Sequence, residues 1–469
     1  MTKRTEDGNS HRVASILDPV RLVRDGWPRL LFPFAIGVVL LGARNPDPLL
    51  NPAVFAEDGV WVGMALTNGW FQTLAEARTD YLVLGNILLL YLATKLSWVL
   101  SGNDLTVLPE AIAMISYSFY SAVATGAFAV TKDMANRPTR IALFLLLLLI
   151  PLGTTQNEVI GRIVQVGFYM PFITVLLLLS RERRDSLRWC VAHDLGLFIC
   201  AATNPMAVAI VFPYLAWTFM KRHAPRAWAR RNGLLGVALL LLIAFLIPRL
   251  GGKGGLPVSF DASGVVAAVL ARPIAYPFVF PFYPWLSDVW AIAFVALWLA
   301  FVGVCCAVSS NKLATTAIVA SVLVLALQDA ATIGLRPGVT SILAGYKTSF
   351  PDRYFMGMNV FVSFATALSI GQLLESRFKR AGQAAFGAIA LLYFASLPLI
   401  FEFRAPRYPI RTGMNFPEQL CASAIVENGA FALIQIYPLP WTMSVPASRV
   451  SKAYCDKGNG LFTRLRFTG

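Results

Sequence analysis

The sequence predicts an all-α polytopic membrane protein, and three observations lead to this prediction. Of the 469 residues, 57% are hydrophobic and 14% are charged, whereas soluble domains are about 25% charged. The mean hydropathy is +0.63. Apolar runs recur along the chain, and short clusters of Lys and Arg separate them. The formal net charge of +15 therefore indicates cytoplasmic loops and argues against nucleic-acid binding.

The chain is expected to divide into three parts. Residues 1–29 are polar and basic, too long and too charged for the start of a signal peptide, and they predict a cytoplasmic N-terminal leader. Residues 30–400 contain the apolar runs and form the transmembrane domain. Residues 401–469 form an extracytoplasmic tail. Its stretch "GAFALIQIYPLPWTMSVP" contains a β-like apolar run, so we expect a small segment with some β structure.

The basic loops set the predicted orientation. Loops 131–140, 181–188, 221–231 and 375–380 are rich in Lys and Arg, and such loops remain in the cytoplasm together with the N-terminus. This orientation suits every loop only if one of the apolar runs 82–100 and 107–130 does not cross the membrane, and the run 82–100 is the better candidate because it contains polar residues and starts close to the acidic pair at residues 57 and 58.

We therefore predict that residues 82–100, which include Asn86 and Lys95, form an apolar helix on the outer face. The alternative is that this run crosses and that Lys132 and Arg137 are exceptions to the charge rule. The preferred reading gives about 11 transmembrane helices, plus outer-surface helices in the first outer loop. The expected crossings lie near residues 30–44, 107–130, 140–153, 163–180, 190–203, 206–220, 232–249, 288–309, 313–330, 354–374 and 382–400. The Asn204–Pro205 dipeptide predicts a tight turn between two of them at the outer surface.

Two adjacent acids, Glu57 and Asp58, stand in the first outer loop within "FAEDGVW". Charges near a bilayer are costly and often mark function. The two acids could instead cap the helix that begins near Val60, although capping requires only one of them. Asp80 and Tyr81 follow in the same loop as candidate acceptor contacts.

Other polar candidates fall in later outer loops: Asn157, Glu158 and Arg162 in the second, and Lys347, Asp352 and Arg353 at the end of loop 331–353. Glu158 and Arg162 also have the i,i+4 spacing of a plain surface pair. Asp352 and Arg353 also suit an N-cap and an interfacial anchor. The outer loop 250–287 opens with "RLGGKGG", which lacks nucleotide-loop spacing and predicts a flexible lid.

The combination of these groups favours one kind of chemistry. A carboxylate can take a proton from an acceptor hydroxyl, and Arg and Lys side chains can hold a phosphate leaving group. With all of them on one side of the membrane, the pattern suits group transfer from a lipid-linked phosphate.

With this layout the chain resembles the GT-C glycosyltransferases, polytopic enzymes that take a sugar from a polyprenyl-phosphate donor on the outer face. "FAEDGVW" looks like the "AEDG" stretch of a bacterial branch of this superfamily. The resemblance implies that Asp58 or Glu57 is the catalytic base and that Glu158 is a second acid.

The resemblance also implies that Arg353 binds the donor phosphate, with Arg162 as the second choice and Lys347 as a further contact. It places the chain in a bacterial inner membrane, with a cell-envelope glycan or lipid as acceptor and no nucleic-acid partner. A clear DxD triplet is absent from the sequence, so the cofactor stays unknown and no metal ligand is assigned. The sugar and the acceptor are not specified.

Two other functions stay open at this point. A lipid-linked glycan transporter or flippase would place charges at mid-membrane and show an internal repeat. An O-antigen-type polymerase or ligase would use arginines and a histidine in large outer loops. The chain has three histidines, His11, His193 and His223, and two of them fall in or near predicted cytoplasmic segments.

Two cysteines, Cys421 and Cys455, lie in the tail without the CxxC spacing of a zinc site. If the tail is extracytoplasmic, the pair suits a disulfide.

Overall fold

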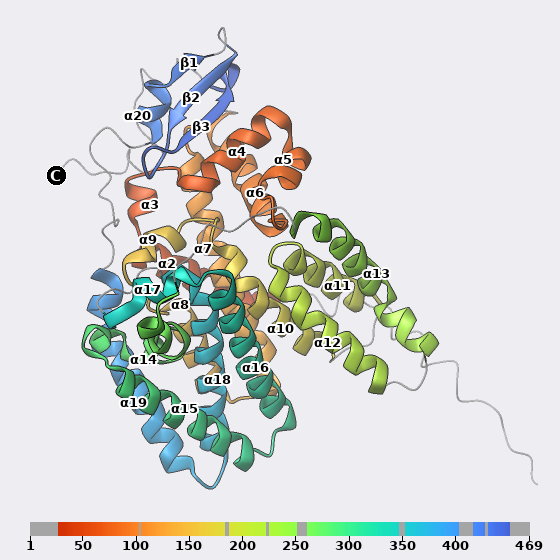
Figure 1. Cartoon of the computed structure of the whole chain (residues 1–469), viewed down its shortest axis with the longest axis vertical. Helices are drawn as coiled ribbons and strands as arrows, with labels where there is room; N and C mark the ends of the chain where they lie inside the picture. Colours follow the sequence, from red (N-terminus) through yellow and green to blue (C-terminus); the bar gives the residue numbers. More distant parts are fainter. Residues whose placement is uncertain are drawn as a thin grey trace, which may run out of the picture.

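The computed structural model describes residues 27–102, 105–182, 187–221, 225–250, 260–346, 352–402, 416–426 and 430–450. The chain is a bundle of helices with one small sheet at its end, beside α4 (Ala56–Asn68) and α5 (Trp70–Glu76) (Figure 1). This confirms a mainly helical membrane protein with a little β structure near the C-terminus.

Within the described residues, eight helical segments are long and apolar enough to cross a membrane. They are Leu84–Ser101, Leu108–Asp133, Trp228–Pro248, Ala262–Trp285, Asp288–Val308, Lys312–Leu335, Met356–Glu375 and Lys379–Phe401. Six of them coincide with predicted crossings. The other two, Leu84–Ser101 and Ala262–Trp285, are segments that the sequence placed on the outer face.

The N-terminal helices pack around α7 (Leu108–Val130), which contacts α2 (Trp27–Arg44), α6 (Leu84–Ser101) and α8 (Arg137–Leu148). Arg44 ends α2 in a fully buried position. Its guanidinium donates hydrogen bonds of 2.6 Å to the carbonyl oxygens of Leu148 and Ile150. These bonds satisfy the last carbonyl of α8 and one two residues beyond it, and they fix the ends of the two helices together.

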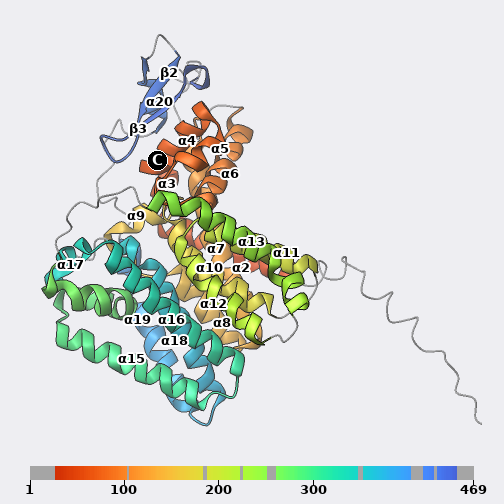
Figure 2. The same ribbon diagram turned by 45° about the vertical axis from the view of Figure 1, so that its right-hand side comes forward.

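A second group consists of α10 (Met170–Arg181), α11 (Leu187–Ala201), α12 (Pro205–Lys221) and α13 (Pro225–Leu250), seen beside the rest of the bundle in Figure 2. The predicted turn at Asn204–Pro205 is confirmed, because α11 ends at Ala201 and α12 begins at Pro205. Asn204 holds this turn by accepting a hydrogen bond from the Met206 N–H at 2.9 Å.

The third group contains α15 (Asp288–Val308), α16 (Lys312–Leu335), α18 (Met356–Glu375) and α19 (Lys379–Glu402). Helix α18 is central: its residues from Met356 to Leu373 are buried, and it contacts α8, α15, α16 and α19. Small residues such as Ser363, Ala365 and Ala367 allow this close packing.

The prediction of a flexible loop over residues 250–287 is wrong for Ala262–Trp285, which is helical and includes α14 (Tyr276–Val279). The helical segment contains one charged residue, Arg272. In the structure Arg272 is fully buried, with its guanidinium 3.1 Å from the centre of the Tyr276 ring.

The two ends of this helical segment return to the same short stretch of chain, residues 338–346, which contains α17 (Gly338–Leu343). The Asp261 N–H donates to the Thr340 hydroxyl, and the rings of Tyr283 and Tyr346 lie 5.5 Å apart. The segment is therefore bent back at one end of the bundle.

The C-terminal segment consists of α20 (Phe416–Cys421) and an antiparallel sheet in the order β1 (Ala424–Val426), β2 (Phe431–Gln435), β3 (Thr442–Pro446). Side chains of β2 and β3 alternate between buried and exposed, as expected for a sheet with one packed face. The packed face contacts α4 through β3. The proposed disulfide falls outside the described residues, because neither the side chain of Cys421 nor Cys455 is described.

Candidate functional site

A polar cavity of about 230 Å³ lies where the first turn of α4, the start of α6, the segment 164–168 and the turn at 203–204 meet. Its charged and polar lining residues are Glu57, Arg78, Tyr81, Asn86, Gln165, Thr203, Asn204, Arg336 and Arg353. Trp61, Phe168 and Tyr354 supply aromatic walls. The cavity thus combines one carboxylate with three guanidinium groups.

Glu57 reaches this cavity because of the way α4 begins. Ala56, the first residue of α4, has a φ of +39°, which a residue with a side chain rarely adopts. Backbone pairing with the C-terminal segment holds it there. The Ala56 N–H donates to the Tyr437 carbonyl at 2.6 Å, and the Tyr437 N–H donates to the Val54 carbonyl at 2.9 Å. Glu57 then lies 4.0 Å from Arg78, and both side chains are partly exposed to the cavity.

Asp58, one residue further on, points away from the cavity and is fully buried. Its Oδ2 accepts a hydrogen bond from the Ile163 N–H at 3.0 Å. Burial raises the pKa of Asp58 to about 7, although the Ile163 hydrogen bond and the nearby Arg162 charge oppose this. Neither acid caps α4, since the N-cap residue is Phe55 and it has no side-chain capping bond.

Residues 162–164, which Asp58 contacts through the Ile163 amide, form further hydrogen bonds with α6 and α7. Asn86 donates hydrogen bonds to the carbonyls of Ile163 at 2.8 Å and Val164 at 3.0 Å. Ser116 donates to the Arg162 carbonyl at 2.8 Å. The adjoining Gln165 is thereby fixed in the cavity wall.

The opposite wall consists of two arginines around one tyrosine. The guanidinium carbon of Arg336 lies 4.3 Å from the centre of the Tyr354 ring, and that of Arg353 lies 5.2 Å from it. Arg353 also forms an ion pair of 2.5 Å with Glu158, in α9 (Gln156–Val159). Since Glu158 does not line the cavity, it orients Arg353 from behind.

The structure thus brings together Glu57, Tyr81 and Arg353 on one cavity, with Glu158 bonded to Arg353. Asn157 is buried and Asp80 is partly buried, and neither lines this cavity. Lys347 and the side chain of Asp352 fall outside the described residues.

The assignment of Arg162 as a phosphate-binding residue is corrected by its position. Its side chain is buried, does not line the cavity, and donates a hydrogen bond of 2.5 Å to the Ala53 carbonyl. Its guanidinium carbon lies 5.4 Å from the centre of the Phe55 ring. Arg162 therefore supports the loop that precedes Glu57.

Several cavity residues were not assigned to the site from the sequence: Arg78, Asn86, Gln165, Asn204 and Arg336. Asn86 was noticed as a polar residue in an apolar run, and Arg336 directly follows a transmembrane run. The sequence shows that both residues are unusual, but only the fold shows that they line the same cavity.

The arrangement can hold an anion against Arg336 and Arg353 and can accept a proton on Glu57. In the part of the chain that the structure describes, no group of three or more His, Cys, Asp or Glu side chains could hold a metal ion. No model of a known protein family matches the chain, and no curated protein is similar to it.

Proposed function

We propose that this protein is a membrane glycosyltransferase that moves a sugar from a polyprenyl-phosphate donor to a cell-envelope glycan or lipid. One observation carries the proposal: Glu57 shares a single cavity with Arg336 and Arg353. A base and a phosphate-binding pair within one small hollow are the groups that such a transfer requires.

Glu57 is the better base of the two adjacent acids, because it lines the cavity whereas Asp58 is buried behind it. In the proposed step, the Glu57 carboxylate takes the proton of the acceptor hydroxyl. That oxygen bonds to the anomeric carbon, and the bond from this carbon to the phosphate oxygen breaks. Polyprenyl phosphate leaves with the electron pair, so a single displacement inverts the anomeric centre.

The leaving phosphate is assigned to Arg336 and Arg353. Guanidinium groups bind phosphate oxygens in a bidentate manner. The ion pair with Glu158 fixes the Arg353 side chain, while no acid among the described residues lies within 4.0 Å of Arg336. Arg336 therefore keeps its charge for the ligand.

The positions of the basic loops support an outer-face site. Loops 131–140 and 375–380 meet at the end of α18 remote from Arg353, where Gln372 donates to the Met134 carbonyl. Loops 181–188 and 221–231 lie at the ends of α11 and α12 remote from Asn204. With these loops in the cytoplasm, the N-terminus is cytoplasmic and the tail and the cavity face the periplasm of an inner membrane.

Helix α6 fits the same arrangement. It begins beside the cavity, where the Gly85 N–H donates to Thr203 at 2.7 Å. It ends near the C-terminal sheet, where the guanidinium carbon of Arg449 lies 5.0 Å from the centre of the Trp98 ring. Both of its ends thus lie on the side of the cavity, as for a helix along the outer face.

The test is Glu57→Gln, which keeps the side-chain shape and removes the base. We expect transfer to fall by about 10²–10⁴-fold, with accumulation of the polyprenyl-phosphate sugar and loss of the modified glycan in mass spectra of cell envelopes. Glu76→Gln is the matched control, because Glu76 is exposed on α5 outside the cavity. Unchanged envelopes with Glu57→Gln would exclude the proposed base.

A further inference from the structure

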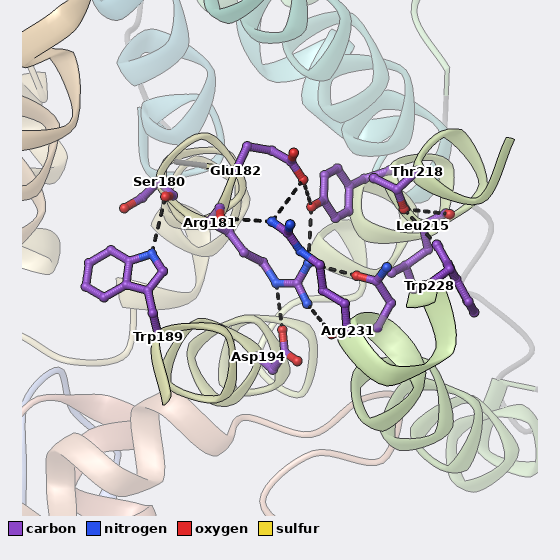
Figure 3. Close-up of polar contacts among 11 residues, drawn as sticks. Ser180, Arg181, Glu182, Trp189, Asp194, Leu215, Thr218, Trp228 and Arg231 are labelled. Atoms are coloured by element: carbon purple, nitrogen blue, oxygen red, sulfur yellow. Dashed lines mark hydrogen bonds and ion pairs between the residues drawn. The ribbon is translucent and has the colours of Figure 1, made fainter. Parts of the chain in front are cut away.

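The ends of α10–α13 remote from the cavity contain a buried charged cluster, drawn in Figure 3. Its centre is Arg181, whose side chain is fully buried. Arg181 donates hydrogen bonds of 2.8 Å to Asp194, to Asn232 and to the Arg231 carbonyl. These partners come from α11 and α13, so the cluster ties the end of α10 to both helices.

The nearby acidic side chains are already paired within this cluster. Asp194 is the ion-pair partner of Arg181, and Glu182 pairs with Arg231 at 3.7 Å while accepting a hydrogen bond from the Tyr214 hydroxyl. Within the described parts of α10–α13, Glu182 and Asp194 are the acids at this end.

Four further cations are exposed around the cluster: Arg188 on α11, Lys221 on α12, and Arg226 and Arg230 on α13. Across the described residues, none of the four lies within 4.0 Å of an acid. Their charge is therefore not neutralised by the described part of the protein, and it is concentrated at one end of a helical group.

The residues beside these cations have the character of a membrane interface. Trp217 is exposed, and the Lys221 ammonium lies 4.8 Å from the centre of its ring. Phe219 and Met220 are also exposed. Aromatic rings next to Lys and Arg at the end of an apolar helix are typical of the lipid headgroup level.

The lengths of the helices bring the cations to this level. Helices α11 and α12 have 15 and 17 residues, or about 22 and 25 Å at 1.5 Å per residue. The hydrocarbon core of a bilayer is about 30 Å thick. If the turn at residue 204 is level with one headgroup layer, helices of this length end a few ångströms short of the other. The long Lys and Arg side chains at these ends can then extend to the lipid phosphates of that layer, and they do not reach into bulk water.

We propose that Arg188, Lys221, Arg226 and Arg230 form a binding surface for anionic phospholipid headgroups. Anionic headgroups supply the negative charge that this surface lacks, and each Lys or Arg near a membrane surface strengthens such binding by about fivefold. The surface lies at the far end of the helices from the cavity, and the inference does not depend on the proposed enzymatic activity.

The test uses the full chain in vesicles of phosphatidylcholine with 30 mol% phosphatidylglycerol. In one set of vesicles the phosphatidylglycerol is brominated and in the other the phosphatidylcholine, and bromine quenches the fluorescence of nearby tryptophans. Each protein is measured with and without Trp217→Phe, so that the quenching of Trp217 is obtained by difference. For the wild type we expect stronger quenching by brominated phosphatidylglycerol than by brominated phosphatidylcholine.

Replacing all four cations by Gln should remove this preference, whereas Arg188→Lys, Arg226→Lys and Arg230→Lys together should retain it because the charge remains. Arg377→Gln, Lys379→Gln and Arg380→Gln, three exposed cations of another loop, serve as the matched control and should leave it unchanged. Equal quenching by both lipids in the wild type, or a preference that survives the fourfold Gln variant, would overturn the proposal.

Discussion

Glu57 and Asp58 show how much the environment of a single residue decides. Both are carboxylates in the first turn of α4, but one lines a polar cavity and the other is sealed behind it against the Ile163 amide. The sequence could identify the pair as unusual. It could not separate the two roles, because adjacent helix positions differ in direction by about 100° and only the fold shows which direction is the cavity.

Burial of Asp58 leads to a pH prediction for Asp58→Asn. The pKa of about 7 in the folded protein lies above the usual value of about 4, so between these values the folded chain holds a proton that the unfolded chain has released. Wild-type stability should therefore fall as the pH rises from about 4 to about 7, by up to about 4 kcal/mol, and then level off.

The Asn side chain does not titrate, so this fall should be absent in Asp58→Asn. Melting temperatures in detergent at pH 5 and pH 8 would check this, and the variant should gain relative to the wild type at pH 8. A wild type and variant with parallel pH profiles would show that Asp58 is not protonated on folding.

Arg336 provides the second prediction at this scale. If Arg336 binds the donor phosphate as proposed, replacing it with Gln removes a charged contact in both substrate and transition state. The KM for the polyprenyl-phosphate sugar should then rise by about tenfold or more. Arg377→Gln changes an exposed arginine in the turn after α18 and should leave KM unchanged. An Arg336→Gln enzyme with wild-type KM would remove this residue from the phosphate site.

At the scale of elements, the C-terminal sheet and α4 act as one unit. Backbone pairing joins residues 54–56 to Tyr437, and the Phe416 N–H donates to the Pro52 carbonyl at 2.7 Å. The sequence predicted a small tail with β structure, but strand pairing between residues nearly 400 positions apart leaves no local pattern. The link between the tail and Glu57 therefore became visible only in the fold.

Gly63→Ala tests this unit. A Cβ at Gly63 would lie 2.6 Å from the Ser444 carbonyl oxygen of β3, which is backbone and cannot turn aside. The variant should loosen the sheet from α4, accelerate proteolysis of the C-terminal segment, and lower transfer. Gly303→Ala is the control, since nothing lies within 4 Å of that position, and it should be neutral or stabilising by up to about 1 kcal/mol. Equal rates of proteolysis and of transfer in the two variants would contradict a packed α4–β3 contact.

Two segments, α6 and Ala262–Trp285, are long and apolar enough to cross a membrane, although the sequence predicts both on the outer face. Both are as apolar as a crossing helix, yet the two ends of each contact the same side of the bundle. For α6 the loop charges predict a helix along the outer face, and this stays a prediction. For Ala262–Trp285 the sequence predicted a loop, because the glycine-rich stretch "RLGGKGG" precedes it.

At the scale of the whole molecule, the cavity and the basic loops lie at opposite ends of the helices that connect them. Single cysteines in an otherwise cysteine-free chain should therefore divide into two groups. With a membrane-impermeant maleimide on intact cells, Gln72→Cys on α5 and Lys95→Cys on α6 should react, and Lys132→Cys should react only after permeabilisation. Reaction of position 132 from outside, or protection of position 95, would contradict the orientation.

We propose that the bond between a sugar and polyprenyl phosphate is broken in the cavity around Glu57. The most direct measurement supplies purified protein in vesicles with a polyprenyl-phosphate donor labelled in its sugar, and native membranes as the source of acceptor. We predict that labelled sugar passes to the acceptor with release of polyprenyl phosphate, and that Glu57→Gln supports neither. Wild-type protein that moves the intact donor across the bilayer without cleaving it, or a Glu57→Gln variant that transfers sugar at the wild-type rate, would contradict the account.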